Sequence, residues 1–273
     1  MKKISYAVLM AILFVGFTGC GDDSSSTGPD VEENPPQIPD LTEVAQPDVS
    51  YFEENNPQGQ KEKESQILDD HYSNYTNARF KAIFGTFFTS FGQLYMGFLN
   101  PAYDESPDFN DGQWVWTYDH SVEGESISMQ FTAEDVGSSV SWAMFVAYDD
   151  GQGGGYNYKV MEGTTSDDGS QGSWTFNAYE EDGTTEKPAA KTEWDVTSET
   201  ERTINTDLYN DDGSVDTAFD YEQNGAEHTM VFTDAGNSDT DTVFWDTDTK
   251  TGYVIEDGEK MCWDDAFQNI ACE

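Results

Sequence analysis

The sequence predicts a mainly β fold, in which a large antiparallel meander sheet or open curled barrel of about 11–12 strands carries one long helix on its concave face. Three observations support this prediction. Apolar and polar residues alternate in short runs between residues 113 and 263, as half-buried strands require. Turn pairs such as Asp182–Gly183 and Asn224–Gly225 separate these runs, and such pairs favour tight hairpins. No helical pattern interrupts the series, which argues against the crossovers of a parallel sheet.

The alternation also predicts which residues form the core. In the first run Trp114, Trp116 and Tyr118 share one face, while Val115 and Thr117 share the other. The chain has seven tryptophans, and because the pattern places most of them on one face, we expect them to fill a core. The alternative is that exposed tryptophans stack on sugar rings. A two-sheet β-sandwich is the alternative architecture.

A helix is predicted over about residues 62–99, where large apolar residues recur at three- and four-residue steps. Asn100–Pro101 predicts its end. The second half, Ala82–Leu99, has no charged residue and approaches the roughly 20 residues that a membrane span needs. However, small and polar residues such as Thr86 and Thr89 line the face opposite the phenylalanines. This pattern favours a helix that is buried against protein on most sides.

The first nineteen residues have the layout of an export signal. Lys2 and Lys3 precede an apolar run, Tyr6–Phe17, which is followed by Thr18 and Gly19. The stretch ending in Gly19–Cys20 resembles the signals of bacterial lipoproteins, although Phe17 stands where leucine is usual. The resemblance implies that Cys20 becomes the N-terminus and carries the lipid anchor, palmitate included, and that the protein goes to the outer membrane, because the residue after Cys20 is not aspartate. An ordinary secretory signal with an incidental cysteine is the alternative.

Residues 20–58 are predicted to be a tether between this anchor and a single folded domain at residues 59–273. The stretch is rich in proline, serine and acidic residues, a composition that does not bury enough apolar surface to offset the entropy of ordering. Ile38, Leu41, Val44 and Tyr51–Phe52 are the exceptions, and docking of these residues on the domain is the alternative to a free tether.

The chain is strongly acidic: 12 basic and 54 acidic residues give a formal net charge of −42. Such a surface repels nucleic acid and anionic lipid headgroups, so we expect no nucleic-acid partner. Acidic residues occur along the whole chain and lysine is scarce, which favours halophilic adaptation, since salt screens repulsion between solvated carboxylates. Specific cation binding is the alternative.

Two of the three cysteines are predicted to form a disulfide. If Cys20 carries lipid, Cys262 and Cys272 remain, and an even number of cysteines in an exported protein favours pairing. The bond would close a C-terminal loop and hold Trp263–Phe267 against the domain. Two free thiols are the alternative.

Residues that could carry chemistry form no recognisable catalytic group. His71, His120 and His228 lack the spacing of a zinc site, and no nucleophile, phosphate-loop or dinucleotide motif occurs, so no cofactor is expected. The acidic pairs Asp239/Asp241 and Asp246/Asp248 lack the arrangement of a calcium loop, which favours solvated turns. Candidate carboxylate pairs are too numerous to be informative.

These observations predict a lipid-anchored cell-envelope protein with a non-enzymatic binding or structural role. The membrane is its expected partner through the N-terminal lipid, and an envelope protein, a glycan or an apolar small molecule is the candidate ligand. An exported binding module for polysaccharide or an apolar ligand is the alternative, followed by a sugar-acting hydrolase. A sheet face filled by the helix would indicate a scaffold or interface, whereas an open cavity would indicate a ligand site.

Overall fold

The computed structural model describes residues 34–55, 70–122, 125–149, 155–179 and 185–272. The chain divides into two units, Met1–Asn34 and Pro35–Glu273, and the fold described is that of the second. The predicted signal peptide, Cys20 and the first part of the predicted tether lie outside the described residues. The folded unit begins well before residue 59, so the predicted domain boundary is too late.

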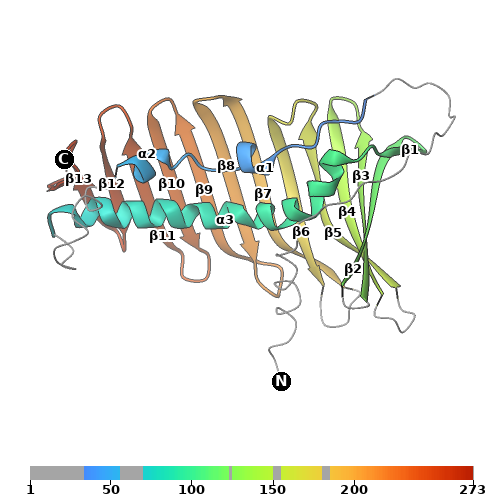
Figure 1. The fold of residues 1–273 in the computed structure, drawn as a ribbon. Coiled ribbons are helices and arrows are strands. Elements are labelled where there is room, and N and C mark those ends of the chain that lie inside the picture. The colour runs from blue at the N-terminus through green and yellow to red at the C-terminus, as the bar shows by residue number, and fades with distance from the viewer. Residues whose placement is uncertain (1–33, 56–69, 123–124, 150–154, 180–184, 273) are drawn as a thin grey trace. The chain divides into compact units, whose positions relative to one another are not determined.

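The fold is mainly β, as predicted, with the strands in one antiparallel meander. Each strand pairs with its neighbours in the chain, and β1 does not pair with β14, so the sheet is open (Figure 1). The two-sheet sandwich is therefore wrong. The strands are β1 Asp108–Asn110, β2 Gln113–Val122, β3 Glu125–Asp135, β4 Ser139–Asp149, β5 Gly155–Ser166, β6 Gln171–Tyr179, β7 Glu186–Ser198, β8 Glu201–Tyr209, β9 Val215–Asn224, β10 Glu227–Asp234, β11 Asp239–Asp246, β12 Thr251–Glu256, β13 Glu259–Trp263 and β14 Asn269–Ile270.

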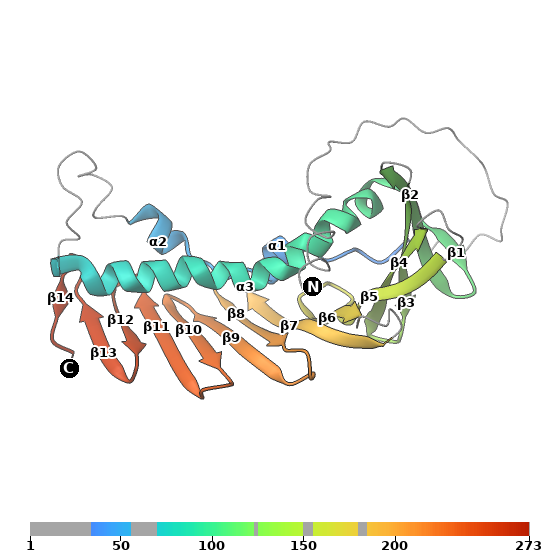
Figure 2. The ribbon, with the colours of Figure 1, turned by 90° about the horizontal axis from the view of Figure 1, so that it is seen from below.

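Helices cover one face of this sheet (Figure 2). They are α1 Leu41–Val44, α2 Ser50–Glu54, the 3₁₀ turn η2 Asp70–Tyr72 and α3 Ser73–Asp104. α3 crosses the strands and contacts β11, β12, β13 and β14 as well as β3 and β7. In the described part of the chain, no helix has both the length and the apolar character that crossing a bilayer requires.

The prediction of one long helix over residues 62–99 is not supported in that form. α3 begins only at Ser73, and the packing of its side chains is described mainly over Ser73–Thr89. A tertiary contact fixes this start: Asn269 Oδ1 accepts a hydrogen bond from the backbone N–H of Asn74 at 3.1 Å. The first backbone N–H groups of a helix have no partner within it, so β14 supplies one that the local sequence does not show.

α3 packs on the sheet through its small residues. Ala78, Ala82 and Thr89 are buried, and a Cβ built on Gly85 would lie 2.9 Å from the Phe219 ring. Phe80, Phe84 and Phe87, the phenylalanines of the predicted stripe whose side chains the structure describes, are exposed instead of buried. The physical reason is that bulky aromatic side chains already occupy this sheet face, which leaves room only for small helical residues. Glycine at position 85 therefore allows α3 to lie this close to the sheet.

Glycine–tryptophan pairs fill part of the core. Gly163, Gly172 and Gly252 lie directly opposite Trp174, Trp194 and Trp263 on the neighbouring strands. At Gly252 a Cβ would lie 2.3 Å from the Trp263 ring, so only glycine leaves space for the indole. All seven tryptophans are buried: Trp114, Trp116, Trp142, Trp174, Trp194, Trp245 and Trp263. The prediction that they form a core is confirmed.

Candidate functional site

Residues 35–55, which precede α3 and which we call the docked segment, pack on the helix-bearing face of the sheet. Ile38, Leu41 and Phe52 are buried, and the Phe52 ring lies edge-on to Trp245 at 5.0 Å between centroids. The Tyr51 hydroxyl donates to the Lys250 carbonyl at 3.0 Å, and burial raises the pKa of Tyr51 to about 12. The chain's own residues therefore occupy the sheet face on which an open ligand cavity was one possibility. The prediction of a free tether up to residue 58 is wrong for residues 35–55.

A buried polar group joins this segment to β9 and β10. The Tyr221 hydroxyl oxygen accepts the backbone N–H of Asp48 at 3.2 Å and lies 2.8 Å from His228 Nδ1. Either atom can be the donor in this contact, according to the tautomer of His228. Burial lowers the pKa of His228, partly opposed by the Asp48 carboxylate. The ring also stacks on Trp245 at 4.8 Å, so its role is to support the docked segment.

An ion-pair group joins α3 to β11 and β12. Lys81 Nζ lies 2.5 Å from Asp241 Oδ2 and 2.8 Å from Glu256 Oε1, while Asn77 Nδ2 donates to Glu256 Oε2 at 2.9 Å. Burial alone would lower the pKa of Lys81, but the hydrogen bonds to both carboxylates hold that pKa above its usual value. The hydrogen bonds that Glu256 accepts from Lys81, with the larger effect, and from Asn77 lower the pKa of Glu256.

The opposite face of the sheet carries polar and acidic side chains. On β7, Lys191 pairs with Glu193 at 2.8 Å. Burial raises the pKa of Asp207, partly opposed by Lys191, and burial together with Asp207 raises the pKa of Asp220. A raised pKa suits an acid catalyst only where a cleft brings a substrate to the carboxyl group. These carboxyl groups lie on an open sheet face, so they give a polar contact surface.

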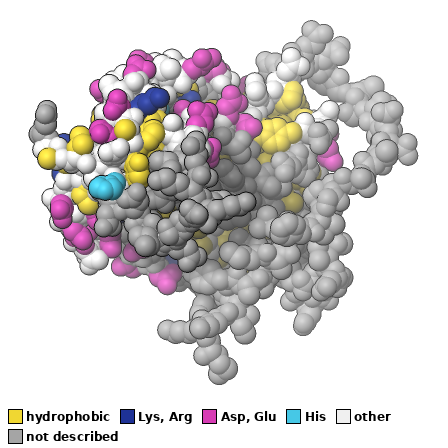
Figure 3. Space-filling model, turned by 60° about the vertical axis from the view of Figure 1, so that its left-hand side comes forward, with side chains coloured by type: hydrophobic (Ala, Val, Ile, Leu, Met, Phe, Trp, Pro, Cys, Tyr) yellow, Lys and Arg dark blue, Asp and Glu magenta, His cyan; other side chains and the backbone are white. Residues whose placement is uncertain are grey.

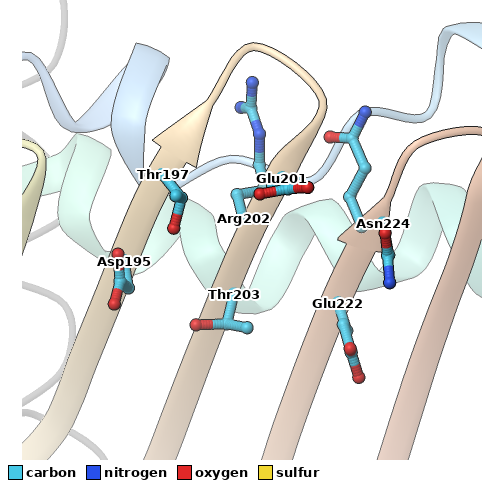
Figure 4. Close-up of a pocket in the computed structure, with 8 residues that line it drawn as sticks. Asp195, Thr197, Glu201, Arg202, Thr203, Glu222 and Asn224 are labelled. Carbon is cyan, nitrogen blue, oxygen red and sulfur yellow. The ribbon is translucent and has the colours of Figure 1, made fainter.

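A shallow hollow lies near one end of β7, β8 and β9. Asp195, Thr203 and Glu222 come from these adjacent strands (Figure 4) and are direct cross-strand neighbours. The Asp195 carboxylate accepts a hydrogen bond from the Gln171 side chain at 3.1 Å, and the Arg202 guanidinium donates to the Glu43 carbonyl of the docked segment at 3.4 Å. The hollow offers carboxylate and hydroxyl groups to a polar partner, without a nucleophile paired to a base.

The hydrophobic side chains exposed on α3 form a second candidate surface. Phe80, Ile83, Phe84 and Phe87 line a shallow apolar hollow, and we call these four residues the phenylalanine ridge. The Phe80 and Phe84 rings stack with centroids 6.3 Å apart, and the Phe84 and Phe87 rings with centroids 6.1 Å apart. In the view of Figure 3, acidic side chains are spread among hydrophobic and neutral ones instead of forming one patch.

The predicted disulfide is present between Cys262 and Cys272, with Cα atoms 5.3 Å apart. It ties β13 to the C-terminal segment, as expected, and the buried Trp263 ring lies 5.7 Å from the Tyr75 ring of α3. Cys20 lies outside the described residues.

The three histidines considered above as zinc ligands lie in three different elements. His71 lies in η2, His120 in β2 and His228 in β10. Within the described residues, no group of three or more His, Cys, Asp or Glu side chains could hold a metal ion. Asp239 and Asp241 lie at the start of β11, whereas Asp246 and Asp248 flank its other end. Asp246 Oδ1 accepts the backbone N–H groups of Asp248 and Thr249, which is the behaviour of a turn residue.

Comparison of the chain with protein-family models, with characterised proteins and with solved structures finds no match. The phenylalanine ridge could not be recognised from the sequence, because its helical period is the same as that of a buried stripe. The small residues on the other face of the helix were the one signal of which side packs on the sheet.

Proposed function

We propose that this chain is a lipid-anchored protein of the cell envelope, held in the outer membrane through Cys20, whose folded unit has a non-enzymatic binding or structural role. The observation that carries the proposal for the folded unit is the filled sheet face. The strands turn their tryptophans to one face of the sheet. The docked segment, with the buried Phe52, and the small residues of α3 cover that face. A sheet built in this way offers a broad surface to a partner instead of enclosing a small molecule.

The exposed face of β7, β8 and β9 is the proposed contact surface for a polar envelope partner, protein or glycan. It carries Glu193, Asn205 and Asp220 in one cross-strand row and Asp195, Thr203 and Glu222 in the next. Because the chain has a net charge of −42, it repels acidic partners. The partner is therefore polar, and these side chains bind it through hydrogen bonds. Stacking on polysaccharide is less well supported, because every tryptophan is buried.

Metabolic labelling with a palmitate analogue tests the anchor. We expect label on the wild-type chain and none on Cys20→Ser, while Cys262→Ser, the matched cysteine control, keeps its label. Fractionation should place the labelled protein with outer membranes. Label that survives in Cys20→Ser would contradict the proposed attachment.

Binding of the chain to purified envelope material tests the contact surface. Glu193→Gln combined with Glu222→Gln should weaken binding about tenfold, as expected when hydrogen bonds to charged groups are lost. Val136→Ser, an exposed change in the β3–β4 turn, is the control. Equal binding by all three proteins would refute this surface.

A further inference from the structure

The phenylalanine ridge is unusual for so acidic a chain. Phe80, Phe84 and Phe87 are 69%, 47% and 61% exposed, and Ile83 is 38% exposed. With about 200 Å² for each aromatic side chain, the ridge presents roughly 400 Å² of apolar surface. Continuous patches of this size on soluble proteins commonly mark interaction sites.

The ridge also lies in a segment without negative charge. No Asp or Glu occurs from Ser73 to Tyr103, whereas Arg79 and Lys81 lie within it, in a chain with 54 acidic residues. Acidic residues elsewhere repel a negatively charged lipid surface and favour water. Among the described elements, α3 is therefore the one that a lipid surface can approach with the least electrostatic repulsion.

The chain enters the folded unit next to α3. The Tyr103 hydroxyl of α3 donates to the Pro39 carbonyl at 3.4 Å, and Pro39 lies beside the β5–β6 turn at Gly169. Cys20 and Pro39 are 39 − 20 = 19 residues apart, a length that spans at most about 65 Å when extended. α3 itself, with 32 residues, is about 48 Å long. A lipid on Cys20 can therefore hold any part of α3 at a bilayer surface.

We propose that the phenylalanine ridge inserts into the interfacial layer of the same bilayer that holds the lipid on Cys20. This inference rests on the proposed lipid anchor and adds a second membrane contact to it. Phenylalanine and leucine are typical of the apolar face of helices that lie in the membrane interface, and the apolar area buried there adds to the affinity that a lipid anchor provides. A second copy of the chain fits the ridge less well, because roughly 400 Å² per copy is about half the 800 Å² per partner of a standard interface.

The test places an environment-sensitive dye on the ridge of the full, lipidated chain. In Ile83→Cys the new thiol is the only free one, because lipid occupies Cys20 and Cys262 pairs with Cys272. The protein is reconstituted into phosphatidylcholine vesicles in 1 M NaCl, where the Debye length is about 3 Å. We expect an aqueous quencher to reach this dye about fivefold less than the same dye on Val136→Cys in the same vesicles, as for a group several ångströms below the headgroups. Val136→Cys, at an exposed turn 50% accessible to solvent, is the control and should be fully open to the quencher.

Adding Phe84→Ser and Phe87→Ser to Ile83→Cys should restore quenching, and because both side chains are exposed, the melting temperature should not change. Mass spectrometry of the same samples reports the lipid separately. A lipidated protein whose ridge is quenched like Val136→Cys would overturn the membrane contact and leave the anchor standing. A chain without lipid would overturn the anchor and, with it, this inference. Protection of the dye that rises with the ratio of protein to lipid would assign the ridge to a second copy, and would also overturn this inference.

Discussion

Replacing Lys81 with methionine tests how α3 is held on the sheet. Lys81 Nζ lies within 2.8 Å of carboxylate oxygens on both β11 and β12, and its side chain is only 14% exposed. Methionine keeps the hydrophobic stem but leaves Asp241 and Glu256 next to each other without a cation. An exposed pair contributes about 0–1 kcal/mol, and breaking a buried pair costs about 3–5 kcal/mol. For this partly buried group we expect a loss of about 2 kcal/mol.

For a folded unit of this size, 1 kcal/mol corresponds to about 2–4 °C in melting temperature, so Lys81→Met should melt about 4–8 °C below wild type. Circular dichroism during heating in 0.15 M NaCl measures the shift. The difference should shrink in 1 M NaCl, because salt screens the remaining carboxylate repulsion. Lys187→Met is the control, since its partner Asp211 is 96% exposed. Equal melting of Lys81→Met and wild type, or equal losses in both variants, would refute the reasoning.

Three further predictions concern the core, acid stability and salt. Gly252→Ala places a Cβ 2.2 Å from the Phe244 carbonyl oxygen and 2.3 Å from the Trp263 ring, so it should cost about 2–3 kcal/mol in urea unfolding. Gly236→Ala, whose Cβ would lie 3.2 Å from the Asp234 carboxylate oxygen, should stay within about 0.5 kcal/mol. The folded unit holds His228 neutral with a lowered pKa, so the unfolded chain binds the extra proton and stability should fall as pH drops from about 6.5 toward the folded value; a His228→Phe variant with the same slope would contradict this. The melting temperature should fall steadily from 2 M to 0.1 M NaCl because repulsion within the −42 chain is less screened, and a salt-independent value would argue against halophilic adaptation.

Much of the sheet could be predicted because its signals are local. Alternation and turn pairs are properties of neighbouring residues. Asp257–Gly258, between β12 and β13, is one more such pair, and both residues have positive φ, as a type I′ hairpin requires. The edge strands β1 and β14 are too short, at three and two residues, to show any period, so the expected number of strands was too low.

The helical layer could not be predicted in the same way, because distant residues determine it. The start of α3 depends on Asn269, almost 200 residues later. The proline-rich composition of residues 35–55 indicated a tether, but composition averages conceal single anchors such as Phe52, which enters a site formed by Trp245 and Trp263. Which side of α3 faces the sheet depends on the space left by the sheet's aromatic residues, as the contact of Gly85 with Phe219 shows.

We propose that a lipid on Cys20 holds this folded unit at the outer membrane. Mass spectrometry of the N-terminal fragment of the protein, purified from its native membrane, tests the claim most directly. We expect a mature chain that begins at Cys20 and carries acyl chains. A chain that begins at another residue, or that begins at Cys20 with an unmodified thiol, would contradict it.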